Sequence, residues 1–134
     1  MEKHHATCSW TPSAGYLAQT PFGEIKMFDD GGHRAVELML LAVAACLDFF
    51  LAEYVRERKL PVSRLHVTCE GEISKHPERV SAIRTTIKID GELSDKEVTK
   101  MVTMCERACK VMNTIKHQPQ MHIIVEPLSM VTPQ

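Results

Sequence analysis

The chain lacks any concentration of charge of one sign. Its 134 residues carry 16 lysines and arginines against 17 aspartates and glutamates, and no run of basic residues forms a stripe. This balance gives no electrostatic footprint for nucleic acid. The opening segment, residues 1–5, also lacks the apolar stretch of a secretory signal, so we expect a cytoplasmic protein.

The sequence also lacks a long hydrophobic run, a disulfide pattern and a metal-binding motif. Its most apolar stretch, residues 38–52, is shorter than the roughly 20 residues that a membrane span needs, and Asp48 interrupts it. The cysteines number five, an odd count that argues against a disulfide framework. The histidines are scattered at spacings that fit no metal site. We therefore expect a soluble protein with reduced thiols, no metal, no cofactor and no membrane partner.

The sequence contains the pattern of a single α+β domain over residues 1–134. Three short N-terminal strands are predicted first, because apolar residues alternate there between turn signals. A glycine loop at residues 29–32 then leads to the rest of the domain. The three strands are predicted at residues 6–10, 15–19 and 23–28.

The most apolar segment is predicted to be one long helix from about Arg34 to Arg58, closed by Lys59-Leu60-Pro61. Its first three turns are apolar on nearly every side, which is typical of a central, buried helix. Because so few strands from one chain are available to cover it, we expect a homodimer that sandwiches two such helices.

A hairpin, a second helix and a final strand are predicted after the long helix. Residues 65–73 and 83–89 alternate apolar and polar side chains, as two paired strands do. Ser94 and Glu97 have the spacing of a capping box at a helix start, and one apolar stripe then runs over residues 98–112. A last strand is predicted at residues 121–125.

Two cysteines are candidates for a redox centre. Cys46 lies in the apolar long helix and Cys109 near the end of the second helix. A thiol buried in a helix is most often inert packing, but a second thiol brought alongside would make a redox pair. Cys105 lies one turn before Cys109 on the same face, so it is an alternative partner. Cys8 and Cys69 are expected to pack, with Cys69 facing inward.

These features resemble the OsmC/Ohr family of thiol-dependent hydroperoxide reductases. The likeness lies in residues 31–47, where a glycine loop leads into a helix with Ala-Ala-Cys, and in residues 109–115, Cys-Lys-Val-Met-Asn-Thr-Ile. Ala35 and Lys110 stand where many members have proline, and residues 1–33 lack the arginine of the strongly active members. The resemblance covers essentially the whole chain, implies an intertwined homodimer and points to a less characterised branch.

The resemblance also implies a reaction. Cys46 would attack a hydroperoxide and become a sulfenic acid, Cys109 would close a disulfide with it, and an external dithiol would restore both thiols. Glu37 matches the glutamate of the family helix, and Arg34 is the nearest candidate cation. On a straight helix Glu37 lies roughly 13–14 Å from Cys46 on the opposite face, and Arg34 about 18 Å away. Either would reach Cys46 only from a partner subunit or through a helix break.

Two other functions fit the pattern. A dimeric binding protein of the same fold, with a small apolar ligand, is favoured by the missing N-terminal arginine. An acyl-thioester enzyme of the hotdog type also wraps a sheet around a long central helix. That second alternative leaves the capped second helix and its late cysteine unexplained.

Overall fold

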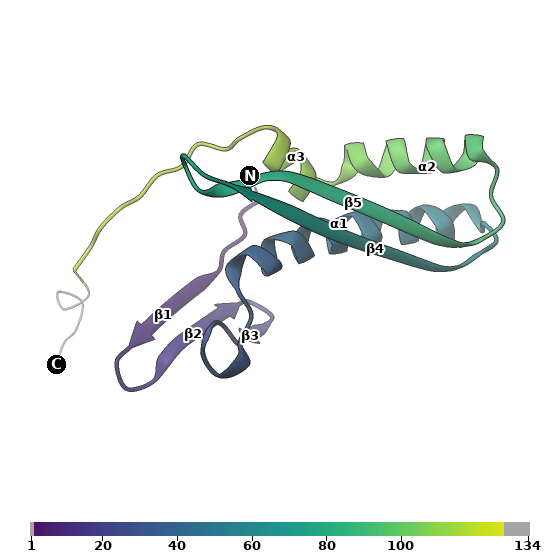
Figure 1. The fold of residues 1–134 in the computed structure, drawn as a ribbon. Coiled ribbons are helices and arrows are strands. Elements are labelled where there is room, and N and C mark those ends of the chain that lie inside the picture. The colour runs from purple at the N-terminus through teal and green to yellow at the C-terminus, as the bar shows by residue number, and fades with distance from the viewer. Residues whose placement is uncertain (1, 128–134) are drawn as a thin grey trace.

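The computed structural model describes residues 2–127 and has the predicted α+β class. A three-stranded N-terminal sheet is followed by a long helix, a two-stranded ribbon and two further helices (Figure 1). The strands are β1 (Thr7–Thr11), β2 (Gly15–Thr20), β3 (Gly23–Ile25), β4 (Val62–Ser74) and β5 (Arg79–Gly91). The helices are the 3₁₀ turn η1 (Asp29–Gly31), α1 (Ala35–Arg58), α2 (Asp95–Ala108) and α3 (Lys110–Lys116).

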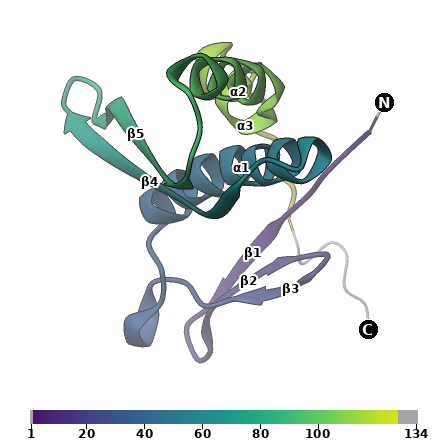
Figure 2. The same cartoon turned by 90° about the vertical axis from the view of Figure 1, so that its right-hand side faces the viewer.

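The body of the molecule is built around α1. Strand β4 packs along one side of α1, and α2 and α3 pack along another, while further sides of the helix remain uncovered (Figure 2). Strands β4 and β5 pair antiparallel along their whole length, and their apolar residues face the helix. The centre of the core consists of Leu47, Leu51, Tyr54, Met101 and Cys105.

Helix α1 matches the predicted bounds, and one chain covers it only in part. Leu51 is fully buried, whereas Leu41 and Phe49 on the same helix are each 58% exposed. This is the shortage of cover that the sequence predicted, because one chain supplies packing partners for only part of the helix. At 24 residues, α1 is also long and apolar enough to cross a membrane by length and composition, a test that the core helix of a globular protein passes equally.

The start of α2 confirms the predicted cap and adds a link to α1. The Ser94 hydroxyl accepts a hydrogen bond from the Glu97 backbone N–H at 3.1 Å, as an N-cap residue does. The Glu97 carboxylate does not complete the capping box. It accepts a hydrogen bond of 2.9 Å from the hydroxyl of Tyr54, whose ring lies 3.8 Å from the Arg58 guanidinium carbon. This buried tyrosine ties the end of α1 to the start of α2.

The N-terminal sheet has one apolar face, which is largely uncovered apart from the edge-on contact of the Tyr16 ring with Phe28. Its strands are in the order β1-β2-β3, with Cys8 opposite Ala18 and Trp10 opposite Tyr16. Ala18 is in turn opposite Ile25, so these five residues share a face while the neighbouring polar residues point to the other side. Trp10 is 59% exposed, and the sheet stands apart from the body (Figure 2).

The strand predicted at residues 121–125 is absent. The chain after α3 has no regular secondary structure up to residue 127, and no ladder in the described part of the chain includes it. Its apolar side chains are nevertheless strand-forming types and lie in solvent, with Ile123 91% exposed. The prediction was wrong for one chain because a strand needs a neighbouring strand to satisfy its backbone groups.

Candidate functional site

The thiols of Cys46 and Cys109 meet where the middle of α1 passes the junction of α2 and α3. The Cys109 thiol lies close enough to the Cys46 side chain for that side chain to influence the titration of Cys109. Both cysteines are free, Cys109 being completely buried and Cys46 half-buried. The structure therefore brings together the two cysteines that the sequence singled out, from elements more than 60 residues apart.

Cys109 reaches this position because the helix that carries it is interrupted. The apolar stripe over residues 98–112 predicted one helix, and that prediction was wrong. Helix α2 ends at Ala108, Cys109 itself is extended with φ −72° and ψ 107°, and α3 begins at Lys110. In an unbroken helix Cys105 and Cys109 would lie one above the other on the same face. The extended residue instead turns the Cys109 thiol toward α1.

The surroundings of Cys109 favour its neutral form. Burial raises the pKa of the Cys109 thiol, and the neighbouring Cys46 thiol raises this pKa further. The backbone N–H groups of Met112 and Val111 act in the opposite direction, since they favour the thiolate. With burial as the largest influence, Cys109 is a protonated thiol at neutral pH.

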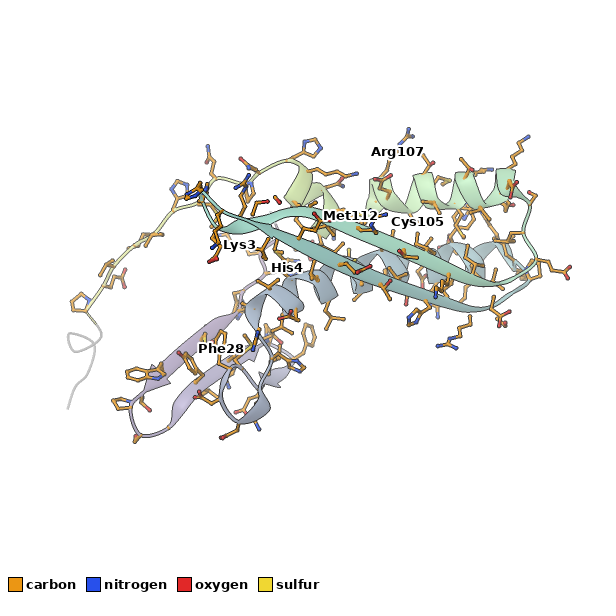
Figure 3. All side chains as sticks on the ribbon, in the orientation of Figure 1. Lys3, His4, Phe28, Cys105, Arg107 and Met112 are labelled. Carbon is orange, nitrogen blue, oxygen red and sulfur yellow. The ribbon has the colours of Figure 1, made fainter. Side chains whose placement is uncertain are left out.

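The alternative partner, Cys105, lies in different surroundings. It is buried between α1 and α2, where burial raises the pKa of its thiol and the charge of Arg58 lowers it. Figure 3 shows Cys105 and Met112 on the side of the helices that faces the body, while Arg107 points outward. The thiol that contacts Cys46 is therefore Cys109, and Cys105 belongs to the core cluster around Tyr54.

Glu37 and Arg34 do not join the two thiols. Arg34 is the residue before α1, Glu37 is in its first turn, and both side chains are exposed. Helix α1 is continuous from Ala35 to Arg58, so the separation of Glu37 from Cys46 along it is about 13–14 Å. Within one chain, neither residue acts on Cys46.

An apolar groove lies among α1, β5, α2 and α3 and has a volume of about 410 Å³. Neither Cys46 nor Cys109 lines it, but Val43 and Met112, in its wall, stand three residues from Cys46 and Cys109 respectively, which is nearly one helical turn. The groove was not predicted from the sequence, although these two spacings were a signal for it. The remaining lining is Val80, Ser81, Ala82, Ile83, Thr85, Glu106, Ile115 and Lys116.

The remaining cysteines lie outside the pair. Cys69 faces inward, as predicted, and its sulfur is 3.4 Å from the Thr85 hydroxyl oxygen. Cys8 is exposed rather than packed, because the apolar face of the N-terminal sheet has no cover within the chain. Over residues 2–127, no group of three or more histidine, cysteine, aspartate or glutamate residues is arranged to hold a metal ion.

Comparison with known proteins agrees with this fold. A hypothetical protein from Aquifex aeolicus VF5 is 20% identical, with a TM-score of 0.75 over 88% of this chain and 90% of that one. An OsmC-like protein from Mycoplasma pneumoniae is 16% identical, with a TM-score of 0.74 over 87% and 89%. An organic hydroperoxide resistance protein from Legionella pneumophila is 18% identical, with a TM-score of 0.61 over 87% and 91%.

These likenesses to solved structures are below 25% identity, so they establish the fold alone. A search of curated protein sequences found no match. The sequence itself matches the family model described as OsmC-like protein over residues 28–123, which include both Cys46 and Cys109. The chain therefore belongs to the OsmC-like family.

Proposed function

We propose that the protein is a homodimeric, thiol-dependent reductase of organic hydroperoxides, with Cys46 and Cys109 as its redox pair. The observation that carries this proposal is that two free thiols from distant parts of the chain lie side by side, with only one of them accessible. Two free thiols in contact need little movement to close a disulfide. The names of several solved relatives, such as the Legionella pneumophila organic hydroperoxide resistance protein, support the same chemistry.

The exposure of the two thiols assigns their roles in the proposed reaction. Cys46 is half-buried and open to a small molecule, whereas Cys109 is completely buried. The Cys46 thiolate attacks the terminal oxygen of the hydroperoxide, the O–O bond breaks, and an alcohol leaves after taking up a proton. The Cys109 thiol then displaces water from the Cys46 sulfenic acid and forms the disulfide. A dithiol of the cytoplasm reduces this disulfide to two thiols and is itself oxidised.

The groove beside the pair favours organic hydroperoxides over hydrogen peroxide. Its wall is mainly apolar, with Val43, Ile83, Met112 and Ile115 among its residues. A substrate with a hydrocarbon body gains free energy by leaving water for such a wall, at about 25 cal/mol per Å² of buried apolar surface. Hydrogen peroxide has no apolar body and gains nothing from it.

The proposed homodimer is supported by the surface that one chain leaves in solvent. The chain exposes 11187 Å², whereas a compact folded protein of this mass exposes about 7,100 Å². Part of this excess comes from the extended segment at residues 121–125, and the rest includes apolar surface on the free side of α1 and on one face of the N-terminal sheet. Permanent dimers bury a total of about 2,000–5,000 Å² between the two chains, so a second copy is a sufficient cover for these surfaces.

The dimer also bears on the cation that a thiol nucleophile needs beside it, because the thiolate is the reactive form and a neighbouring positive charge stabilises it. Arg34 and Glu37 are exposed at the start of α1, beside Val36, which is 38% exposed. In the proposed dimer these two side chains approach Cys46 of the partner subunit, where the guanidinium stabilises the thiolate.

One experiment tests the redox pair directly. The reduced protein is treated with one equivalent of cumene hydroperoxide, and the disulfides are mapped by peptide mass spectrometry. We expect rapid consumption of the peroxide, a Cys46–Cys109 disulfide and its reversal by a dithiol. Cys46→Ser should abolish consumption, whereas the matched variant Cys69→Ser, at another half-buried thiol, should not. Unconsumed peroxide with both thiols free would contradict the proposal.

A second function, binding of a small apolar ligand without turnover, is favoured by the groove itself. Its volume of about 410 Å³ is within the range of ligand pockets, which starts near 300 Å³. Native mass spectrometry of the purified protein distinguishes the two functions. A retained apolar ligand in a protein with inert thiols would favour binding, and an empty protein that consumes peroxide would favour the reductase.

A further inference from the structure

The helix break at Cys109 occurs where the local sequence favours an unbroken helix. The segment Glu106-Arg-Ala-Cys-Lys-Val-Met112 contains neither glycine nor proline, the two residues that most often end a helix. The break nevertheless sets the position of Cys109, because this residue alone is extended between α2 and α3. Contacts between the two helices must therefore stabilise the extended conformation of Cys109.

Asn113 makes the most direct of these contacts. Its side-chain amide, Nδ2, donates a hydrogen bond of 3.0 Å to the backbone carbonyl of Arg107. In a continuous helix the backbone N–H of Val111 would occupy that carbonyl, since each N–H bonds the carbonyl four residues earlier. The break removes that partner, and the amide of Asn113 replaces it, as capping side chains do at other helix ends.

The backbone of Asn113 belongs to α3. Its N–H donates a hydrogen bond of 3.0 Å to the carbonyl of Cys109, which is the first helical bond of α3 from its N-cap residue. A second contact spans the break, where the Lys116 ammonium meets a carboxylate oxygen of Glu106 at 2.5 Å. One residue of this ion pair belongs to α2 and the other to α3, so the pair joins the two helices at their surface.

We infer that Asn113 is a positioning residue that directs the Cys109 thiol at Cys46, with the Glu106–Lys116 ion pair in a supporting role. Many members of the family that the sequence resembles have a proline directly after the second cysteine, whereas this chain has Lys110 at that position. A proline would interrupt the helix by its missing N–H. In this chain the side-chain amide of Asn113 stabilises the interruption from the opposite side, by satisfying the carbonyl that the break leaves free.

This inference rests on the proposed redox pair and predicts which step depends on Asn113. The attack of Cys46 on the hydroperoxide does not involve Cys109, so its rate should be insensitive to the break. The closure of the disulfide brings the Cys109 sulfur onto the Cys46 sulfenic acid with loss of water, and it depends on how often the thiol is correctly placed. Loss of the Asn113 amide should slow closure alone.

The test compares Asn113→Ala with Thr114→Ala. Thr114 is adjacent, on the same short helix, and its hydroxyl bonds the carbonyl of Lys110 at 2.8 Å without spanning the break. After one equivalent of cumene hydroperoxide, dimedone traps any sulfenic acid before the disulfide closes. We expect Asn113→Ala to consume the peroxide at the wild-type rate and to close the disulfide about five- to tenfold more slowly, an effect typical of one hydrogen bond. Thr114→Ala should behave as the wild type does.

A second measurement tests the positioning role of Asn113 without the peroxide reaction. Each variant is equilibrated in buffers of reduced and oxidised glutathione, and the fraction of Cys46–Cys109 disulfide is measured by peptide mass spectrometry. We expect the equilibrium constant for the disulfide to fall about five- to tenfold in Asn113→Ala. Lys116→Met, which removes the ion pair but keeps the length of the side chain, should lower it less.

The two measurements fail in different ways. If the wild-type protein does not consume peroxide, but Asn113→Ala lowers the equilibrium constant for the disulfide in glutathione buffers as expected, the proposed function is contradicted. The positioning role of Asn113 then still holds. An equilibrium constant unchanged by Asn113→Ala overturns the positioning role, whatever the peroxide result. Closure slowed equally by Thr114→Ala would also overturn it, because any weakening of α3 would then have the same effect.

Discussion

The body around α1 and the N-terminal sheet both carry apolar side chains in amphipathic patterns, but only the body buries them. Leu51 and Met101 are fully buried in the body, while Trp10 and Phe22 of the N-terminal region are 59% and 98% exposed. The body has three layers of its own chain to pack together, since α1 lies between the β4–β5 ribbon and α2 (Figure 2). The N-terminal sheet has one layer and no second one.

This difference shows that the two regions are stabilised in different ways. The body obtains its stability from contacts within one chain, including the link between Tyr54 and Glu97. Within residues 2–127, no second layer covers the apolar face of the N-terminal sheet, so a surface from another copy is its proposed cover. The free side of α1 has the same need, and in the proposed dimer each of these surfaces covers the other.

The largest expected effect is a difference in the free energy of unfolding between substitutions at buried and at exposed positions of α1. Leu51→Ala removes a side chain from the centre of the core and should lower the free energy of unfolding by about 2–5 kcal/mol. Leu41→Ala is the matched change at a leucine of α1 that is 58% exposed. At protein concentrations where the chain is a monomer, it should lower the free energy of unfolding by less than about 0.5 kcal/mol. Urea unfolding measures both. A large and concentration-dependent cost of Leu41→Ala would show that a second copy covers this side of the helix.

A smaller effect is expected for the apolar face of the N-terminal sheet. Trp10→Ala should weaken self-association by about 2 kcal/mol or more, because large aromatic residues dominate the energy of interfaces. Ser9→Ala, on the opposite face of β1, is the control and should leave association unchanged. Sedimentation equilibrium measures both variants. Equal association of wild type and Trp10→Ala would exclude this face from the dimer interface.

The smallest expected effect is a loss of stability of the body at alkaline pH. Burial raises the pKa of Tyr54, Cys105 and Cys109 in the folded chain. The contribution of the two thiols to stability is therefore complete below the unfolded thiol pKa of about 8.5, and it is lost as pH rises through the folded values. Urea midpoints should fall as pH rises above about 8.5, because the unfolded chain then binds fewer protons than the folded one.

The variant Cys105→Ala checks the origin of this alkaline loss. It removes one of the raised groups, so its urea midpoint should depend less on pH than that of the wild type. An equal dependence in both proteins would assign the loss to other groups.

Most elements of the fold were predictable because local patterns specify them. The long helix, the hairpin strands and the cap at Ser94 each depend on residues within a few positions of one another. The strand at residues 121–125 was predicted on the same grounds and is absent from the single chain. The residues of this segment are types that favour strands. A strand forms, however, only where a neighbouring strand supplies hydrogen-bond partners for its backbone groups.

The candidate site was predictable only in part. The sequence identified Cys46 and Cys109, and it left Cys105 open as an alternative because a continuous helix places both late cysteines on one face. The contact between Cys46 and Cys109 depends on the break at the second of them. No local signal marks that break, since the amide of Asn113 that spans it acts from six residues after Arg107.

The sequence by itself determined the class of the fold, the bounds of α1, the start of α2 and the identity of the two candidate thiols, since periodicity, capping and composition are local properties. Only the tertiary structure decided which thiol contacts Cys46 and which apolar faces remain open. Both depend on the angle at which α3 leaves α2 and on the layers that one chain supplies to α1. Such arrangements are set by contacts between distant residues, and a local pattern does not contain them.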